Sequence, residues 1–286
     1  MTALVLTLPA KPSTAQAESS KATKETKPVD DVVFSAGFQY SRLWGATWDS
    51  TTDENLDFEF ERWTGRLRFV LLRYLETVTD IGFQKAHLIY SDPNVEDWSL
   101  LAWRMEMESD PVAFAGQWVG TRTSLGEYFV LKPFVYAETT IGRGEVRPLS
   151  ILVNYRHNEI DITDSAEDNI DKATYYDYRV DGGLELHLEA DWFRAHVGVG
   201  ATRFHGDLKI DYTERGEAAL AAVHVTEEDI KNGRFGETRY GGYLQPGVGI
   251  GFPGGLELYV DLALMRVDHA RVYQVSSGLN CCEANR

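Results

Sequence analysis

The residues best suited to acid–base chemistry flank a short polar break in the chain at residues 191–192. If this break is a turn, one register of the flanking segments places His187 opposite His196, and a shift by two residues places Glu185 opposite His196. Either way a carboxylate and an imidazole can meet, which is the arrangement of a general acid and base. The catalytic candidates are therefore His187, His196 and Glu185.

A hydrolase would also need a nucleophile, and the available serines are Ser35 and Ser150, which nothing in their spacing links to the histidines. The sequence contains no glycine-rich phosphate loop, zinc-ligand spacing or nucleotide-binding motif. An enzyme, as an outer-membrane hydrolase of lipid or peptide, is therefore the less favoured alternative. No cofactor is expected.

Acidic side chains are concentrated in the segment 161–171, where a calcium ion would find oxygen ligands. The segment lacks the central glycine and the terminal glutamate of an EF-hand loop. A solvated loop is therefore the favoured interpretation, and the weak calcium candidates are Asp161, Asp164 and Asp168.

The elements that must position these residues alternate with a period of two. In the segment 33–41, apolar side chains such as Phe34 and Phe38 fall on one face, and small or polar side chains fall on the other. The same alternation recurs at 180–188, 194–202 and 256–264. Strict alternation over such lengths predicts β-strands with one apolar and one polar face. Weaker segments bring the total to about eleven strands.

The connections between these segments alternate between short and long, which predicts an up-and-down meander. Short connections are expected at 76–80, 108–111, 191–192 and 253–255, and long ones at 45–55, 163–174 and 213–237. Two hairpin registers keep apolar side chains on a shared face: Phe252 opposite Leu256, and Met107 opposite Val112.

The direction in which the polar face points distinguishes a soluble barrel from a membrane barrel. After residue 27 the chain has five lysines and 19 arginines, and arginine is the better partner for carboxylates away from bulk water. Tryptophan and tyrosine lie near strand ends, where membrane barrels carry interfacial girdles. These features favour a membrane barrel with a polar lumen over a soluble, lipocalin-like periplasmic binding protein.

On this interpretation the lumen carries a network of paired charges, because ionisable groups away from water need partners. The predicted network consists of Arg62, Arg66, Arg68, Arg104, Glu106, Glu138, Arg156, Glu185, Glu189, Arg194 and Asp261. Such a network would either plug the lumen or line a solute pathway.

Composition narrows the class of protein further. The formal charge of −16 over 286 residues excludes a nucleic-acid binder that works through a basic surface. With 43% hydrophobic and 12% aromatic residues, the chain is too apolar for a disordered protein. Its two cysteines, Cys281 and Cys282, are adjacent near the end of the chain, so they cannot form a disulfide framework.

The segments FSAGFQYS (34–41), RAHVGVGAT (194–202) and LELYVDLAL (256–264), with the short and long connections, resemble those of bacterial outer-membrane β-barrel proteins. The resemblance covers residues 32–275. It implies insertion into the outer membrane by the barrel-assembly machinery, contact with outer-membrane lipid, periplasmic termini and turns, and long external loops. The chain departs from the family pattern at residues 276–286, which do not end on an aromatic strand residue.

The expected organisation is a signal peptide at 1–17, a flexible linker at 18–31, an outer-membrane β-barrel at 32–275 and a C-terminal tail at 276–286. The fold class is all-β, an up-and-down antiparallel transmembrane β-barrel of about 10–12 strands. The expected protein is a monomer of the outer membrane, either structural or a narrow small-solute channel whose charged lumen favours cations because of the −16 charge.

Overall fold

The computed structural model describes residues 32–49, 54–91, 102–155, 158–161, 163–164, 168–190, 192–222, 234–267 and 270–281. All of them belong to one unit, Asp31–Arg286. The predicted signal peptide at 1–17 and linker at 18–31 lie outside the described residues. Within the described ranges, no helix is long and apolar enough to cross a membrane.

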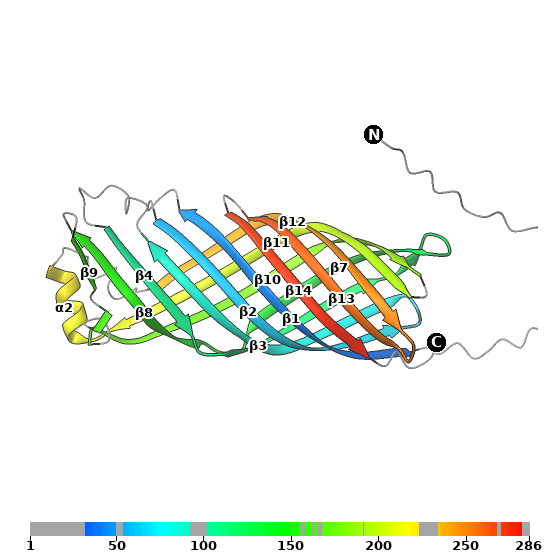
Figure 1. Ribbon diagram of the computed structural model, residues 1–286, viewed down its shortest axis with the longest axis horizontal. Helices are drawn as coiled ribbons and strands as arrows, with labels where there is room; N and C mark the ends of the chain where they lie inside the picture. The colour runs from blue at the N-terminus through cyan, green and yellow to red at the C-terminus, as the bar shows by residue number, and fades with distance from the viewer. Residues whose placement is uncertain are drawn as a thin grey trace, which may run out of the picture. The chain divides into compact units, whose positions relative to one another are not determined.

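The unit is built from antiparallel strands and the helix α2 (Glu214–Ala222) (Figure 1). The strands are β1 (Val32–Asp49), β2 (Glu54–Leu71), β3 (Leu75–Ser91), β4 (Ala102–Ser109), β5 (Val112–Thr121), β6 (Thr123–Ser124), β7 (Phe129–Thr140), β8 (Gly144–Tyr155), β9 (Asn158–Asp161), β10 (Ile170–Glu189), β11 (Phe193–Tyr212), β12 (Arg234–Phe252), β13 (Leu256–Val267) and β14 (Ala270–Cys281).

Ten strands close a ring in the order β2, β1, β14, β13, β12, β11, β10, β7, β5 and β3, and β3 pairs with β2 again. Closure leaves no sheet edge, so the backbone groups of the ring are hydrogen-bonded between strands even where water is absent. The predicted antiparallel barrel of about 10–12 strands is confirmed. Its even strand number is typical of outer-membrane barrels.

The predicted hairpin at residues 108–111 is wrong, because β4 and β5 are two segments of one barrel strand. β4 pairs with residues 87–91 of β3, and β5 pairs with residues 75–84 of the same strand. The break contains Pro111, which has no backbone N–H to donate to the sheet. One extra residue at the break forms a β-bulge, so inward and outward positions exchange between β4 and β5. Met107 and Val112 both point inward across the bulge, which is why a hairpin register also looked consistent. β7 and β8 likewise follow one another, pairing with β5 and β4.

The strand β14 was not predicted, and it closes the barrel against β1, with Phe38 opposite Leu279 and Trp44 opposite Tyr273. The sheet therefore extends past the predicted boundary at residue 275, and the predicted tail is wrong for residues 276–281. Alternation is weak in this segment because the small or polar residues Ser276, Ser277 and Gly278 are consecutive.

Short turns lie at one end of the barrel, here called the turn end. The turn at 253–255 and its register, Phe252 opposite Leu256, are confirmed. The turn predicted at 76–80 lies instead at 72–74, where Leu72 and Arg73 adopt positive φ angles of 50° and 62°. Helix α2 and β9 lie at the opposite end, here called the loop end (Figure 1).

Apolar side chains cover the outside of the barrel toward the turn end. On β13, Leu258, Val260 and Leu262 point outward and are 48%, 49% and 37% exposed. Aromatic pairs border this belt: Phe34–Phe69 toward the turn end, and Tyr40–Trp63 and Trp44–Tyr273 toward the loop end. An apolar band between two aromatic girdles is the outer surface of a membrane-spanning barrel. The lipocalin-like alternative, which places the apolar face inward, is wrong for this part.

Toward the loop end the outer surface becomes charged. Outward-facing ion pairs among the described residues include Arg42–Glu59, Lys85–Glu108, His87–Glu106, Arg147–Asp110, Lys172–Glu145 and Lys209–Asp211. Paired charges of this kind suit a surface in water rather than in lipid. The strands therefore continue past the membrane into solvent.

Because the outer surface changes from lipid-facing to water-facing along the barrel, two similar substitutions are expected to change the free energy of unfolding by different amounts. Val260 and Leu149 both point outward and are 49% and 48% exposed, but Val260 lies in the belt and Leu149 lies on β8 beyond it. Val260→Lys is expected to lower the free energy of unfolding by roughly 2–4 kcal/mol, as for a lysine at the middle of a bilayer. Leu149→Lys is expected to change it little. Urea unfolding in phospholipid vesicles measures both, and equal costs would contradict the assigned membrane boundary.

Candidate functional site

Alternation along β2 directs three arginines into the lumen on the turn-end side. Arg66 donates to Asp80 (Nε to Oδ1, 2.8 Å), and Arg68 donates to Glu76 (Nε to Oε1, 2.7 Å). Both carboxylates come from β3, the neighbouring strand. Lys132 of β7 also contacts Glu76, with 3.0 Å between Nζ and Oε2.

The third arginine of β2, Arg62, occupies the centre of the network and is only 4% exposed. Its Nη1 lies 2.6 Å from Oε1 of Glu138, and its Nη2 lies 3.6 Å from Oδ2 of Asp177. The hydroxyl of Tyr136 donates to Glu138 over 2.7 Å, and the amide of Gln84 donates to Asp177 over 3.0 Å. These contacts join β2, β3, β7 and β10 across the lumen.

The two candidate histidines also lie on the lumen wall, directly opposite each other on β10 and β11. Their rings stack with 5.0 Å between centroids and 21° between planes. Nε2 of His187 lies 2.8 Å from Oε2 of Glu185, and Nε2 of His196 lies 3.6 Å from Oδ1 of Asp261. The first predicted register is therefore confirmed, and the register that placed Glu185 opposite His196 is wrong, since Glu185 pairs with Gly198.

These side chains line a cavity of about 240 Å³ in the turn-end part of the lumen. Its wall carries six Lys or Arg side chains and eight Asp or Glu side chains, so its formal charge is close to balance. The charge of −16 on the whole chain is therefore not concentrated in the lumen, and it gives no reason to expect cation preference there. Ser35 and Ser150, the nucleophile candidates, do not belong to this wall.

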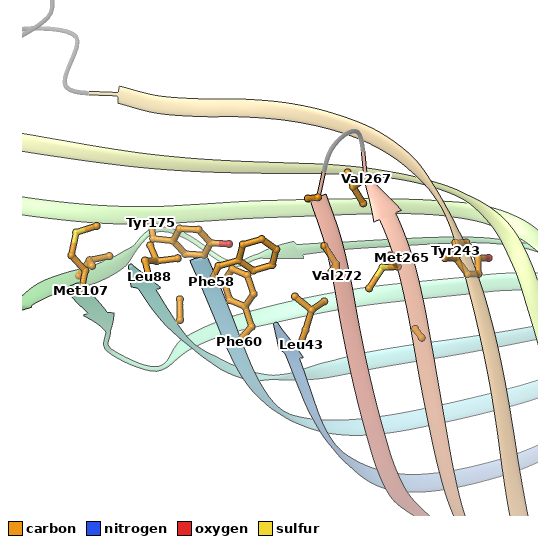
Figure 2. Packing of buried hydrophobic residues seen from close by; sticks show 14 of the residues in the cluster. Leu43, Phe58, Phe60, Leu88, Met107, Tyr175, Tyr243, Met265, Val267 and Val272 are labelled. Atoms are coloured by element: carbon orange, nitrogen blue, oxygen red, sulfur yellow. The ribbon is translucent and has the colours of Figure 1, made fainter. Parts of the chain in front are cut away.

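The lumen changes character toward the loop end, where apolar and aromatic side chains predominate (Figure 2), although the buried Arg239 lies opposite Phe204 there. Phe60 lies between the rings of Phe58 and Tyr175, with 5.6 Å between centroids in each case. Phe204 stacks on Phe58 at 6.3 Å. Residues from strands all around the ring join this cluster: Leu43, Leu88, Met107, Val146, Ala173, Ile210, Met265, Val267 and Val272. We call it the lumen core. No feature of the sequence analysis predicted it.

Most of the predicted network residues lie on the cavity wall: Arg62, Arg66, Arg68, Glu138, Glu185, Glu189, Arg194 and Asp261. The prediction is wrong for Arg104 and Glu106, because the bulge at Pro111 reverses the alternation and turns Met105 and Met107 inward in their place. Glu106 instead contacts His87 on the outer surface. Arg156 lies outside the described residues.

Several charged residues of the lumen were missed, namely Glu76, Asp80, Lys132, Asp177, Arg179, Asp181 and Glu257. Glu76 and Asp80 were hidden because a turn was predicted where β3 actually begins. Lys132 lies six residues before Glu138 on the same strand, so its even spacing was the signal that could have identified it.

Two of the three calcium candidates, Asp161 and Asp168, contact protein groups at the loop end. The carboxylate of Asp161 accepts hydrogen bonds from the backbone N–H and the hydroxyl of Thr163, which lower the pKa of Asp161. Asp168 pairs with Arg215 over 3.2 Å. Across the described residues, no group of three or more His, Cys, Asp or Glu side chains is arranged to hold a metal ion.

Comparison with solved structures finds the same fold in an outer-membrane protease. The outer membrane protease OmpT of Escherichia coli is similar with a TM-score of 0.54 and 10% identity, over 90% of this chain and 99% of that chain. The translocator domain of the autotransporter NalP of Neisseria meningitidis has a TM-score of 0.42 and 8% identity, over 87% of this chain and 88% of that one.

No family model matches the sequence, and no curated protein matches it either. At 10% identity, the likeness to OmpT extends to the fold and not to the activity. The apolar outer belt, the aromatic girdles and the charged lumen are features of a membrane-spanning barrel, so they support the same fold independently. The chain has the fold of bacterial outer-membrane β-barrel proteins.

Proposed function

We propose that the protein is a closed, structural outer-membrane barrel that holds a rigid barrel extension and its loops above the membrane, rather than a solute channel. The lumen core carries this proposal. Apolar side chains from β1, β2, β3, β4, β8, β10, β11, β13 and β14 form one buried cluster inside the loop-end part of the barrel, and this cluster supports the proposal that the lumen is closed.

An ion moving along the lumen would have to lose its hydration shell at this core. The rings of Phe58, Phe60 and Phe204 offer no polar atoms to replace the lost water, and transfer of an unpaired ion into apolar surroundings is very unfavourable. Hydrophobic constrictions stop conduction in channels for this reason. The paired charges below the core then serve mainly to connect the strands across the membrane.

Conductance across a planar bilayer tests this proposal. We expect no steady current from the full-length protein in a membrane where an open general porin, added as the positive control, conducts. Faster migration of the unheated protein on a denaturing gel and protection from protease establish that the silent protein is folded and inserted. A steady current from folded, inserted protein would contradict the proposal.

The hydrolase alternative would depend on the pair His187 and His196. The structure brings both close to carboxylates, but neither Ser35 nor Ser150 lies with them on the cavity wall. The histidines are therefore better accounted for as members of the lumen charge network.

A further inference from the structure

Two arginines face each other on the outer surface of the barrel at the loop-end edge of the belt. Arg266 of β13 and Arg271 of β14 are directly opposite partners in the sheet, and both side chains are exposed. Like charges in directly opposite positions destabilise a strand pair. An anion between the two guanidinium groups would remove this repulsion.

Among the described residues of the strands that carry this pair, no outward-facing acidic side chain lies beside it, and the carboxylates of Asp57 and Glu59 lie on β2, beyond β1. Among the described outward-facing side chains of β12, β13 and β14, the charged ones are Arg266 and Arg271. Several cations elsewhere on the outer surface have carboxylate partners, for example Arg42 with Glu59 and Arg147 with Asp110, whereas Arg203 of β11 lies over the rings of Tyr178 and Tyr240. The pair therefore differs from these ion-paired outer arginines, in a chain whose net charge is −16.

The height of the pair in the membrane indicates where its anion would come from. The next outward residues toward the membrane are Leu264 on β13 and Tyr273 on β14, both at the edge of the belt. Tyr273 stacks on Trp44 of the aromatic girdle. Girdle residues lie at the level of the lipid headgroups, so the two guanidinium groups lie at the level of lipid phosphates.

A groove of about 800 Å³ begins beside Arg271 and extends over β1, β2 and β3. Trp44 and Tyr273 form an aromatic platform in it, with ring centroids 6.0 Å apart and planes at 26°. The remaining lining residues are Arg42, Gly45, Asp57, Phe58, Glu59, His87 and Ile89. Aromatic faces beside carboxylate, imidazole and guanidinium groups suit a sugar ring, whose C–H face is apolar and whose hydroxyls both donate and accept hydrogen bonds.

We infer that this surface binds the phosphorylated sugar headgroup of a lipid from the surrounding membrane leaflet. Arg266 and Arg271 hold the phosphate, because guanidinium groups bind phosphate oxygens through paired, charge-assisted hydrogen bonds. The sugar lies in the groove against Trp44 and Tyr273. The charged and aromatic groups of this site lie on the outer surface, although Phe58 of the lumen core also borders the groove, and binding there does not depend on whether the barrel conducts.

The test is native mass spectrometry of the full chain in a neutral detergent, titrated with bisphosphorylated lipid A as the probe. We expect the double variant Arg266→Gln/Arg271→Gln to lose at least about tenfold in affinity, since roughly 1.4 kcal/mol of binding free energy corresponds to a factor of ten. Arg147→Gln, which removes an exposed outer arginine elsewhere, is the matched control and is expected to bind like the wild type. Trp44→Ala is expected to weaken binding of lipid A but not of phosphatidylglycerol, which has no sugar.

Thermal unfolding separates binding from a purely structural role of the pair. In neutral detergent alone, the double variant is expected to unfold at the same temperature as the wild type or a higher one, because the repulsion is gone. With lipid A present, only the wild type and Arg147→Gln are expected to gain stability. Equal gains in all three proteins would overturn the inference. So would binding of inorganic phosphate as tight as that of lipid A, or tight binding of dephosphorylated lipid A.

Discussion

Arg62→Ala is expected to lower the free energy of unfolding by about 3–5 kcal/mol, the cost of leaving buried charges without a partner. The substitution removes the cation that lies 2.6 Å from Glu138 and 3.6 Å from Asp177, and both carboxylates are less than a tenth exposed. Neither can turn toward bulk water, because the lumen core lies on one side and the paired charges lie on the other. Denaturant unfolding of the detergent-solubilised barrel, followed by tryptophan fluorescence, measures the loss.

The outer pair of Arg42 and Glu59 provides the matched control for this loss. It is also a close contact, with 2.5 Å between Nε of Arg42 and Oε1 of Glu59, but the arginine side chain is 52% exposed. Solvent replaces the interaction there, so Arg42→Ala is expected to leave stability nearly unchanged. Replacing both Arg62 and Glu138 by methionine is expected to recover part of the loss, because buried ion pairs exchange well for apolar side chains of similar size. If Arg62→Ala and Arg42→Ala cost the same, the lumen network is solvated and the description of it as buried is wrong.

Phe60→Ala is expected to lower the free energy of unfolding by about 3–5 kcal/mol, the usual range for removing a buried phenylalanine from a packed core. Phe60 is 2% exposed and contacts the rings of Phe58, Tyr175 and Phe204, which come from three different strands. The cavity left by the ring would be bounded by strands already fixed in a closed ring, so it can collapse only in part. Unfolding in lipid vesicles measures the change.

Phe83→Ala is the control for the lumen core. Phe83 points outward from β3 and is 57% exposed, so in the membrane lipid fills the space that its ring leaves. Its cost is expected to be well below that of Phe60→Ala. A similar cost at both positions would mean that the loop-end lumen is not tightly packed, and it would also weaken the proposal of a closed barrel.

Arg62→Ala and Phe60→Ala together test one architectural feature, the reversal of polarity along the barrel. Toward the turn end, the outside is apolar and the inside carries Arg62, Arg66 and Asp80; toward the loop end, the outside carries ion pairs and the inside is the lumen core. One set of strands thus forms a membrane barrel and continues as a barrel with the polarity of a soluble protein. This arrangement stabilises the extension without requiring support from the loops.

Much of the fold follows from short-range pattern. Strict alternation at 180–188 and 194–202, with a polar break between them, placed both histidines on one face and left two registers open, and the structure selects the one with His187 opposite His196. The turn at 253–255 was predictable because Pro253 and two glycines separate two alternating runs, and Gly254 and Gly255 do adopt positive φ angles of 91° and 81°. A side chain's face relative to its neighbours depends only on the backbone repeat of a strand, which is local.

Whether a side chain at a given height along the barrel faces lipid, water or other side chains depends on neighbouring strands and not on its own strand. The alternation in the sequence therefore gave no prediction, or a wrong one, at such positions. Phe58 and Phe60 share one face of β2 with Arg62 and Arg66, so no single assignment of an apolar face describes that strand. The bulge at Pro111, which turned Arg104 and Glu106 outward, is visible only because β3 pairs with both β4 and β5.

The sequence by itself determined the all-β class, the antiparallel order of neighbouring strands and the membrane belt, because a period of two is encoded within each strand. Only the tertiary structure decided that ten strands close through β14 and that the lumen core gathers at the loop end. It also brought the carboxylates of β3, β7 and β10 together with Arg62. The reason is physical: ring closure brings together residues that are distant in the chain, and the contents of the lumen depend on all ten strands at once.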